Sequence, residues 1–329
     1  MLLGIDLGTG SVKALLLGDD GRVLGEASSS YPVSAPQPGW AETDPSDWWR
    51  GTCEAVRQAV GEHAQDVSAL GLSGQMHGVV LCREDGTPLR PAILWADMRS
   101  SATLESYRAL GSEQRSHLAN PVAAGMAGPS LLWLREHEND TYRAAHWALQ
   151  PKDWLRLRLT GAANADPSDA SATLLFDLQQ DRWSDEITRA LGLRNDWLAP
   201  ITPSHEIAGT LTDEASAELG LEPGLPVATG AADAAASAFG SGLIAPGQVQ
   251  INIGTAMQIF AIRDAPVVDP TLRTHLFRSA SGSWYAMAAM QNAGIALEWV
   301  REILGLSWEE MYRQAFAVAP GCEGVTFLP

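Results

Sequence analysis

Two short loops with related sequences constrain the fold of this chain more than any other feature. Residues 5–10 read Ile-Asp-Leu-Gly-Thr-Gly, residues 251–256 read Ile-Asn-Ile-Gly-Thr-Ala, and an apolar run follows each turn. Because glycine lets backbone N–H groups approach an anion closely, each loop is typical of a phosphate-binding hairpin. We therefore predict a duplicated fold with one such hairpin in each half. Only the first loop carries a carboxylate, Asp6, so only this copy could help to hold a metal ion.

The length of the chain predicts more than one domain. Its 329 residues exceed the size at which one hydrophobic core usually keeps growing, and 46% of them are hydrophobic. We predict a first domain over residues 1–245 and the beginning of a second over residues 246–329, because the second Gly-Thr loop opens a new set of strands. Residues 325–329 read as an apolar strand that has barely begun, so we expect the second domain to be incomplete.

The charge balance limits the classes of partner. With 22 basic and 39 acidic side chains the formal net charge is −17, which argues against nucleic acid and anionic membrane surfaces as partners. The chain meets an acid at Asp6, before any basic flank or apolar run typical of a signal peptide. Three widely spaced cysteines suit a reducing compartment. We expect a cytoplasmic protein.

Hydrophobic patterning predicts an α/β architecture. Strands are expected over residues 2–7, 12–17 and 23–24, and Asp44 is expected to cap a helix that runs to residue 60. The remaining elements expected from the pattern are a buried strand over residues 67–73, a strand over 91–95, a mainly helical region over 100–220 and a short strand over 226–230.

Polar residues follow two of these strands. Gln75, Met76 and His77 lie in a glycine-flanked loop after residues 67–73, and Asp97 and Arg99 follow the strand that ends at residue 95. Ligands of α/β folds gather at such strand ends. A buried, hydrogen-bonded histidine and a surface ion pair are the alternative interpretations of the two loops.

Asp233 is the candidate for a catalytic carboxylate. It follows the strand over residues 226–230 and precedes a run of small residues, a pattern typical of a helix N-terminus. A simple capping role is the alternative. Its place just before the predicted domain junction, where a cleft would lie, favours a base that accepts a hydroxyl proton as the oxygen attacks phosphorus.

Together these segments resemble the FGGY family of carbohydrate kinases, in the superfamily of actin, hexokinase and Hsp70. The resemblance covers the whole chain and implies an actin- and hexokinase-like, ribonuclease H-like duplicated α/β fold, with the first domain complete and the second partial. The Gln-Met-His-Gly loop at 75–78 is typical of xylulokinase-like members and differs from glycerol kinase-like ones. The segments that carry it are residues 4–9, 38–40, 44–45, 48–49, 74–78, 90–95, 151–161 and 168–170.

The resemblance implies an ATP- and Mg²⁺-dependent transfer of a phosphoryl group to D-xylulose. By position Asp233 matches the catalytic base, and Asp6 matches a catalytic residue that holds the metal ion. The sugar contacts that we expect are Gln75, Met76, His77, Trp95, Asp97, Arg99 and Asp233, and the expected phosphate contacts are Gly8, Thr9, Gly10, Lys13, Gly254 and Thr255.

Departures from the family pattern keep alternatives open. Ala231, Ala232 and Ala234 stand where the family typically has glycines and an asparagine, and Ala96 replaces a frequent asparagine. The glycine-rich adenosine loops that follow in the family lie beyond Pro329. A kinase for gluconate, another ketose or a polyol, and a catalytically silent sugar-binding protein, are the alternatives. Monomer and homodimer both remain open.

Overall fold

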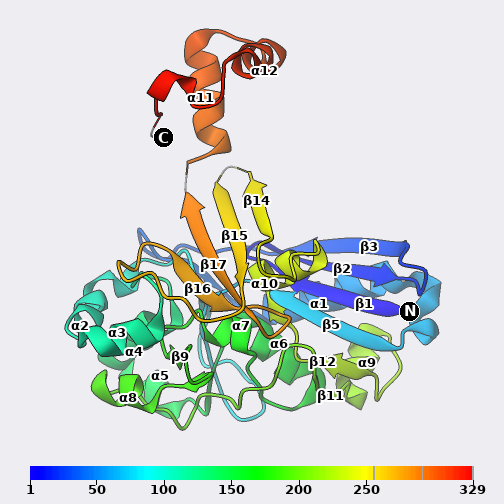
Figure 1. Ribbon diagram of the computed structural model, residues 1–329. Coiled ribbons are helices and arrows are strands. Elements are labelled where there is room, and N and C mark those ends of the chain that lie inside the picture. The colour runs from blue at the N-terminus through cyan, green and yellow to red at the C-terminus, as the bar shows by residue number, and fades with distance from the viewer. Residues whose placement is uncertain (255, 291, 328–329) are drawn as a thin grey trace.

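The molecule consists of a large α/β body, a smaller sheet above it and two helices that stand apart from both (Figure 1). The structure is a computed structural model that describes residues 1–254, 256–290 and 292–327. Among these residues no helix combines the length and apolarity needed to cross a membrane.

The main sheet has strands in the order β11-β12-β5-β1-β2-β3, and β13 also pairs with β5. β1, β2 and β3 form an antiparallel meander, whereas β5 runs parallel to β1. β12 and β13 are in turn parallel to β5, so the carboxyl ends of four strands share one edge. The strands are β1 (Leu2–Leu7), β2 (Ser11–Leu17), β3 (Val23–Ser30), β5 (Ala69–Gly74), β11 (Ile207–Thr210), β12 (Pro226–Ala228) and β13 (Ala231–Ala232).

One face of this sheet is apolar and the other is small and polar. Along β1, Leu3, Ile5 and Leu7 are buried, whereas Gly4 and Asp6 point to the opposite face. The apolar face packs on α1 (Pro45–Val60), whose N-terminus is capped by Asp44 as predicted. β5 shows the same alternation, so the strand predicted to be buried is fully buried on one face and partly buried on the other.

A second hydrophobic core lies among the helices of the middle of the chain. The region predicted as mainly helical is confirmed, although it also carries short strands, and the strand predicted over residues 91–95 shrinks to two residues. The helices are α2 (Leu104–Arg108), α3 (Ser112–Leu118), α4 (Ala127–His137), α5 (Asn139–Ala144), α6 (Pro151–Thr160), α7 (Pro167–Ala170), α8 (Asp185–Ala190) and α9 (Asp213–Leu219), and the strands are β4 (Glu42–Thr43), β6 (Val80–Cys82), β7 (Ala92–Ile93), β8 (Trp147–Leu149), β9 (Phe176–Asp177) and β10 (Arg182–Trp183).

The last part of the chain forms a separate four-stranded sheet in the order β14-β15-β17-β16. It begins at Val249, shortly after the predicted boundary at residue 245, and α10 (Asp233–Gly240) leads into it. The strands are β14 (Val249–Ile253), β15 (Met257–Arg263), β16 (His275–Arg278) and β17 (Trp284–Met290), followed by the helices α11 (Gly294–Leu304) and α12 (Trp308–Ala317).

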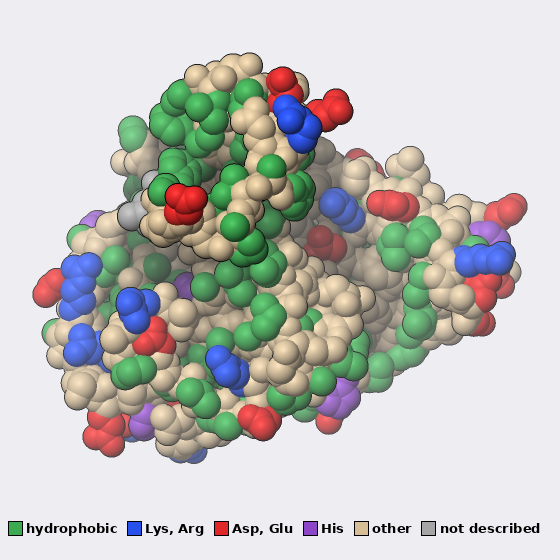
Figure 2. Space-filling view, turned by 45° about the horizontal axis from the view of Figure 1, so that its top comes forward, with side chains coloured by type: hydrophobic (Ala, Val, Ile, Leu, Met, Phe, Trp, Pro, Cys, Tyr) green, Lys and Arg blue, Asp and Glu red, His purple; other side chains and the backbone are tan. Residues whose placement is uncertain are grey.

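The two sheets share a core, while the last two helices expose apolar surface. Met76, Ala231, Ala232 and Ala235 of the main body pack in one cluster with aromatic side chains of the second sheet. Figure 2 shows hydrophobic side chains gathered on the upper lobe and a hollow between that lobe and the main body. The exposed hydrophobic side chains of α11 and α12 include Ile295, Leu297, Trp299, Ile303, Leu304, Trp308, Tyr312 and Phe316.

Candidate functional site

The first Gly-Thr loop is a tight hairpin that three hydrogen bonds hold in place. The amide of Gly8 donates to the carbonyl of Ser11 at 3.0 Å, and a Cβ at Gly8 would lie 2.9 Å from that oxygen, so the turn requires glycine. The Tyr31 hydroxyl and the Gln75 side-chain amide both donate to the Gly8 carbonyl, at 2.7 and 3.0 Å. The amides of Thr9 and Gly10 donate to no group among the described residues, so they are available to an anion.

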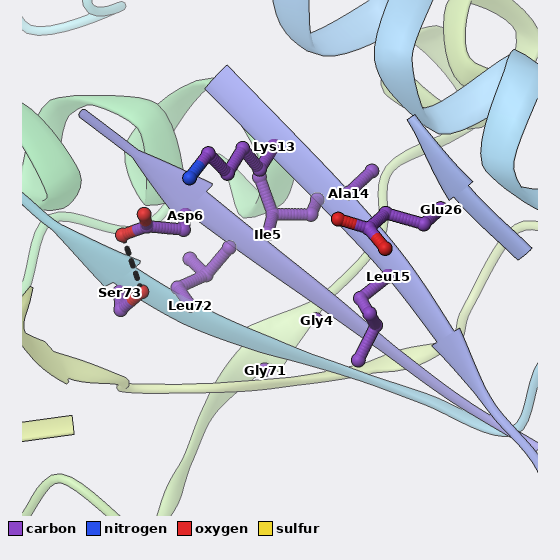
Figure 3. Close-up of a pocket in the computed structure, with 10 residues that line it drawn as sticks. All are labelled: Gly4, Ile5, Asp6, Lys13, Ala14, Leu15, Glu26, Gly71, Leu72 and Ser73. Atoms are coloured by element: carbon purple, nitrogen blue, oxygen red, sulfur yellow. Dashed lines mark hydrogen bonds between the residues drawn. The ribbon is translucent and has the colours of Figure 1, made fainter. Parts of the chain in front are cut away.

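Asp6 lies beside this hairpin, on the polar face of the sheet. The hydroxyl of Ser73 donates to its carboxylate at 2.7 Å, and Lys13 is its register partner on β2. Figure 3 shows both side chains projecting into one cavity of about 400 Å³, which Glu26 also lines. A carboxylate held by one hydrogen bond keeps oxygen lone pairs for a cation, so Asp6 suits a metal ligand.

Asp233 is brought to the same edge by strand pairing. In the parallel strands, Ser73 of β5 is the register partner of both Asp6 of β1 and Ala231 of β13. Asp233 follows directly as the first residue of α10, and its carboxylate accepts the Ala234 amide at 2.6 Å. It is therefore a helix N-terminal residue, as the sequence pattern predicted.

The surroundings of Asp233 make it a weaker acid than usual. Its side chain reaches solvent, yet protein encloses it on most other sides. This burial, together with the negative charge of Asp6, raises its pKa to about 6, although the Ala234 amide opposes the shift. A carboxylate with such a pKa is ionised at neutral pH and can still hold a proton, as a general base requires.

A buried ionic cluster supports β13, the short strand that directly precedes Asp233. The Lys152 ammonium lies 2.5 Å from Asp153, 2.9 Å from Asp166 and 3.7 Å from Asp169. Burial raises the pKa of the Asp169 carboxyl well above its usual range despite Lys152, whereas Lys152 and hydrogen bonds hold the pKa of Asp166 low despite burial. Three carboxylates this close could bind a cation, but the ammonium group already provides the counter-charge.

The cluster connects to Asp233 through Ser168. Its hydroxyl donates to Asp166 at 2.5 Å and accepts the backbone amide of Ala232 at 2.9 Å. In the sequence, residues 151–161 and 168–170 stood out only as segments of the family pattern, and no role was predicted for them. The charged residues Lys152, Asp153 and Arg156, which lie among the apolar residues of α6, were the signal that could have revealed a buried network.

The three predicted sugar contacts in the loop after β5 lie in different surroundings. Met76 is buried in the core shared with the second sheet, and the buried Gln75 amide is engaged by the Gly8 carbonyl. His77 adopts a φ of 70°, and its Nδ1 lies 2.8 Å from the Ala172 carbonyl. A carbonyl only accepts, so Nδ1 carries the proton and Nε2 is an acceptor. Burial lowers the pKa of His77, which keeps the ring neutral.

Trp95 reaches the phosphate loop, whereas Asp97 and Arg99 turn away into the interior. The half-exposed Trp95 indole donates to the Thr9 hydroxyl at 2.9 Å. Both oxygens of Asp97 accept from the Arg99 guanidinium, and the side chains of the two residues are each 1% exposed. The structure thus corrects the interpretation as a surface pair, and it leaves neither group open to a sugar.

The second Gly-Thr loop lies at the tip of the β14–β15 hairpin. The amide of Gly254 donates to the carbonyl of Ala256, two residues on, at 2.8 Å, whereas in the first loop the amide of Gly8 donates to Ser11, three residues on. The Gly254 carbonyl in turn accepts the amide of Gly294 at the start of α11. Thr255, the other predicted phosphate contact, lies outside the described residues.

Comparisons with known proteins agree on the family. The model of the FGGY family of carbohydrate kinases, N-terminal domain, matches residues 1–240. The xylulose kinase of Escherichia coli (strain K12) is 36% identical over the whole chain, and that of Bacillus subtilis (strain 168) is 32% identical. The chain spans 68% and 67% of these two relatives. A xylulose kinase structure from Rhodospirillum rubrum has a TM-score of 0.91 at 29% identity, covering 99% of this chain and 69% of that one.

These matches extend over both sheets and include the segments that surround Asp6 and Asp233. The fold is therefore the actin- and hexokinase-like fold of such kinases, as the two related hairpins predicted. The chain belongs to the FGGY family of carbohydrate kinases.

Proposed function

We propose that this protein transfers the terminal phosphoryl group of ATP to a hydroxyl of D-xylulose, giving D-xylulose 5-phosphate. The whole-chain similarity to proteins named xylulose kinases supports the substrate. The observation that carries the reaction type is the meeting of Asp6 and Asp233 at one sheet edge, beside a glycine hairpin with free amides. This arrangement provides a metal ligand, a base and an anion cradle.

Asp233 acts as the base. Its carboxylate accepts the proton of the attacking sugar hydroxyl, because an alcohol is a poor nucleophile until that proton leaves. The new oxygen–phosphorus bond forms as the bond from phosphorus to ADP breaks. The pKa of about 6 leaves Asp233 ionised at neutral pH and ready to accept.

The residues around the first hairpin fit a nucleotide phosphate with Mg²⁺. The free amides of Thr9 and Gly10 point to phosphate oxygens as ligands, and Lys13 adds a positive charge on the same face. Asp6 would hold Mg²⁺, which neutralises charge on the phosphates. We assign Gly8 to the shape of the turn, and Gly254 with Thr255 to the second phosphate loop.

We propose His77 and Trp95 as the sugar contacts, because His77 has a polar ring atom to offer and Trp95 has an exposed apolar face. The neutral His77 ring offers Nε2 as an acceptor for a sugar hydroxyl, and the half-exposed Trp95 offers an indole face. Gln75 and Met76 act by fixing the loop, since one binds Gly8 and the other packs in the core. We place the protein in the cytoplasm, and a homodimer stays a prediction.

An ADP-release assay with Mg-ATP tests the proposal on a panel of D-xylulose, gluconate, L-ribulose and glycerol. We expect the highest kcat/KM for D-xylulose and a loss of about 10³-fold or more in Asp233→Ala, since the base and its charge are both removed. Preference for another sugar would reassign the substrate. Calorimetric binding of D-xylulose without turnover, in a folded protein, would favour the sugar-binding alternative, which the alanines around Asp233 motivate.

A further inference from the structure

The backbone that leads into Asp233 is held by hydrogen bonds from two directions. On one side β13 pairs with β5. Away from β5, the amide of Ala232 donates to the side-chain hydroxyl of Ser168 at 2.9 Å. Two residues earlier, the amide of Gly230 donates to the carbonyl of Ser204, also at 2.9 Å. Two serines from distant parts of the chain therefore anchor the segment over residues 229–232.

One buried carboxylate joins the two serines. A single oxygen of Asp166 accepts the Ser168 hydroxyl at 2.5 Å and the Ser204 hydroxyl at 2.8 Å. The other oxygen lies 2.9 Å from the Lys152 ammonium, and all four residues are buried. Because the proton of Ser168 is directed to Asp166, the lone pairs of its hydroxyl are left for the amide of Ala232. Asp166 thus orients the anchor that Ser168 provides.

The first residues of the segment are held just as closely. The amide of Thr229 donates to the carbonyl of Glu206 at 2.8 Å, and the carbonyl of Thr229 accepts a hydrogen bond from the Arg156 guanidinium. Gly230 then adopts a φ of 80°, and a Cβ at this position would collide with the carbonyl of Leu72. The chain therefore enters β13 from a closely packed turn.

Asp233 depends on this backbone for the place of its carboxylate. Among the described residues its side chain accepts one hydrogen bond, from the amide of the next residue, Ala234, at 2.6 Å. That bond moves with the local backbone and does not tie the carboxylate to the rest of the site. Asp6, by contrast, accepts a hydrogen bond from Ser73 on a neighbouring strand. The position of Asp233 relative to Asp6 is therefore set by the segment over residues 229–232.

We propose that Ser168 is a positioning residue for Asp233: its hydroxyl, oriented by Asp166, holds the amide of Ala232 and so fixes the backbone that carries the base. The proposal rests on the role of Asp233 proposed above. A displacement of about 1 Å at a catalytic group can lower the rate about 10²-fold. Loss of the anchor should therefore affect turnover more than the binding of either substrate.

The first test is Ser168→Ala, which leaves the amide of Ala232 without its acceptor. We expect kcat to fall about ten- to thirtyfold while KM for D-xylulose and KM for Mg-ATP stay within about twofold. Ser204→Ala removes the other hydroxyl on Asp166 but keeps the backbone carbonyl that Gly230 uses, so kcat should fall by no more than about threefold. An unchanged kcat in Ser168→Ala, a rise in KM at constant kcat, or a larger loss of kcat in Ser204→Ala would overturn the proposal.

Ser184→Ala is the matched control. Ser184 is also buried, and its hydroxyl accepts the backbone amide of Ile187 at 3.2 Å at the start of α8, in the second hydrophobic core. The substitution removes the same kind of hydrogen bond, so it should cost about 1 kcal/mol of stability and leave kcat within about twofold. A loss of kcat equal to that of Ser168→Ala would reduce both effects to general destabilisation and overturn the proposal.

Amide hydrogen exchange provides a second measurement that does not depend on activity. In the wild type the peptide over residues 229–234 should exchange slowly, because the amides of residues 229, 230 and 232 all have acceptors. Ser168→Ala should speed exchange in this peptide about tenfold or more and leave the peptide over residues 184–190 unchanged, and Ser184→Ala should do the reverse.

Rapid exchange of residues 229–234 in the wild type, or equal rates in the wild type and Ser168→Ala, would overturn the proposal. The exchange in the wild type can be read even if a variant fails to fold. Absence of turnover in the wild type would refute the proposed function, and the exchange result would still decide whether Ser168 anchors the segment.

Discussion

The hydroxyl group of Ser73 donates a 2.7 Å hydrogen bond to the carboxylate of Asp6 across the parallel strands β5 and β1. The two residues are 67 positions apart in the chain, and only the pairing of their strands brings them together. The bond occupies one lone pair of the carboxylate, restricts its rotation and leaves the remaining lone pairs for a ligand.

Ser73→Ala should therefore weaken the metal and nucleotide half of the site. We expect KM for Mg-ATP to rise about five- to tenfold, which corresponds to about 1 kcal/mol of lost orientation. Calorimetric affinity for D-xylulose should stay within about twofold. Ser46→Ala, on the exposed surface of α1 against the opposite face of the sheet, serves as the control. An unchanged KM for Mg-ATP would show that Ser73 does not orient a ligand.

Asp233 should impose an acidic limit on activity and a penalty on stability at neutral pH. Its pKa is raised to about 6, so kcat/KM should fall below pH 6 as the base becomes protonated. For the same reason the folded protein loses stability as the pH rises from about 4 through 6, because the folded state binds the proton more tightly than the unfolded state.

Asp233→Asn removes that penalty along with the base. At pH 7 the variant should melt at a higher temperature than the wild type, by about 1 kcal/mol or less in free energy given the solvent contact of the side chain. The two melting curves should converge near pH 4, where the wild-type carboxyl is protonated. A variant less stable than the wild type at pH 7 would contradict this electrostatic account.

Arg99 should matter for folding more than for sugar binding. Its guanidinium lies 2.8 Å from Asp97 and 2.7 Å from Glu42, and it stacks on the Trp40 ring at 3.6 Å. Arg99→Ala leaves the buried Asp97 without its ion-pair partner and Glu42 with Arg90 alone, so chemical denaturation should show a loss of about 3–5 kcal/mol.

The control for Arg99 is Arg108→Ala, which breaks an exposed pair with Glu105 and should change stability by less than about 0.5 kcal/mol. Calorimetry on the folded fraction separates the two roles of Arg99. Unchanged affinity for D-xylulose supports the structural role, whereas a loss of tenfold or more would restore the sugar contact that the sequence predicted.

Trp95→Phe should show whether the hydrogen bond from Trp95 to Thr9 affects binding of Mg-ATP. The substitution keeps an aromatic face and removes the indole N–H that donates to Thr9. We expect KM for Mg-ATP to rise about threefold, because the Thr9 hydroxyl loses a partner, with a smaller change in KM for D-xylulose. Thr9→Val removes the same hydrogen bond from the other side and should have the same effect on KM for Mg-ATP. Opposite effects would refute the coupling.

Local patterns predicted the elements of this fold well. The two Gly-Thr hairpins, the helix capped by Asp44 and the helix that begins at Asp233 all formed where the sequence placed them. Each rests on interactions between neighbours in the chain, such as a glycine turn or a cap to a nearby amide. The buried strand predicted over residues 67–73 formed as β5, but only one of its faces is fully buried, because it presents glycine and serine to a polar face that hydrophobicity alone does not reveal.

The burial and the contacts of polar side chains could not be predicted in the same way. In the sequence, Asp97 and Arg99 follow a strand, as the residues of an exposed site loop do. In the structure, Trp40 and Glu42 pack against the pair and enclose it. Met76 lies in the loop predicted to contact the sugar, yet it is buried because aromatic side chains of the second sheet pack in the same cluster. Neither outcome is written in the spacing of residues along the chain.

The sequence by itself determined the family and the order of the elements, and it singled out Asp6 and Asp233 as the candidate carboxylates, because these depend on motifs and local periodicity. Only the tertiary structure decided which polar groups meet at the site and which are buried as structural pairs. The physical reason is that burial and the pKa of a carboxyl group depend on the charges and surfaces packed around it, and strands distant in the chain supply most of these.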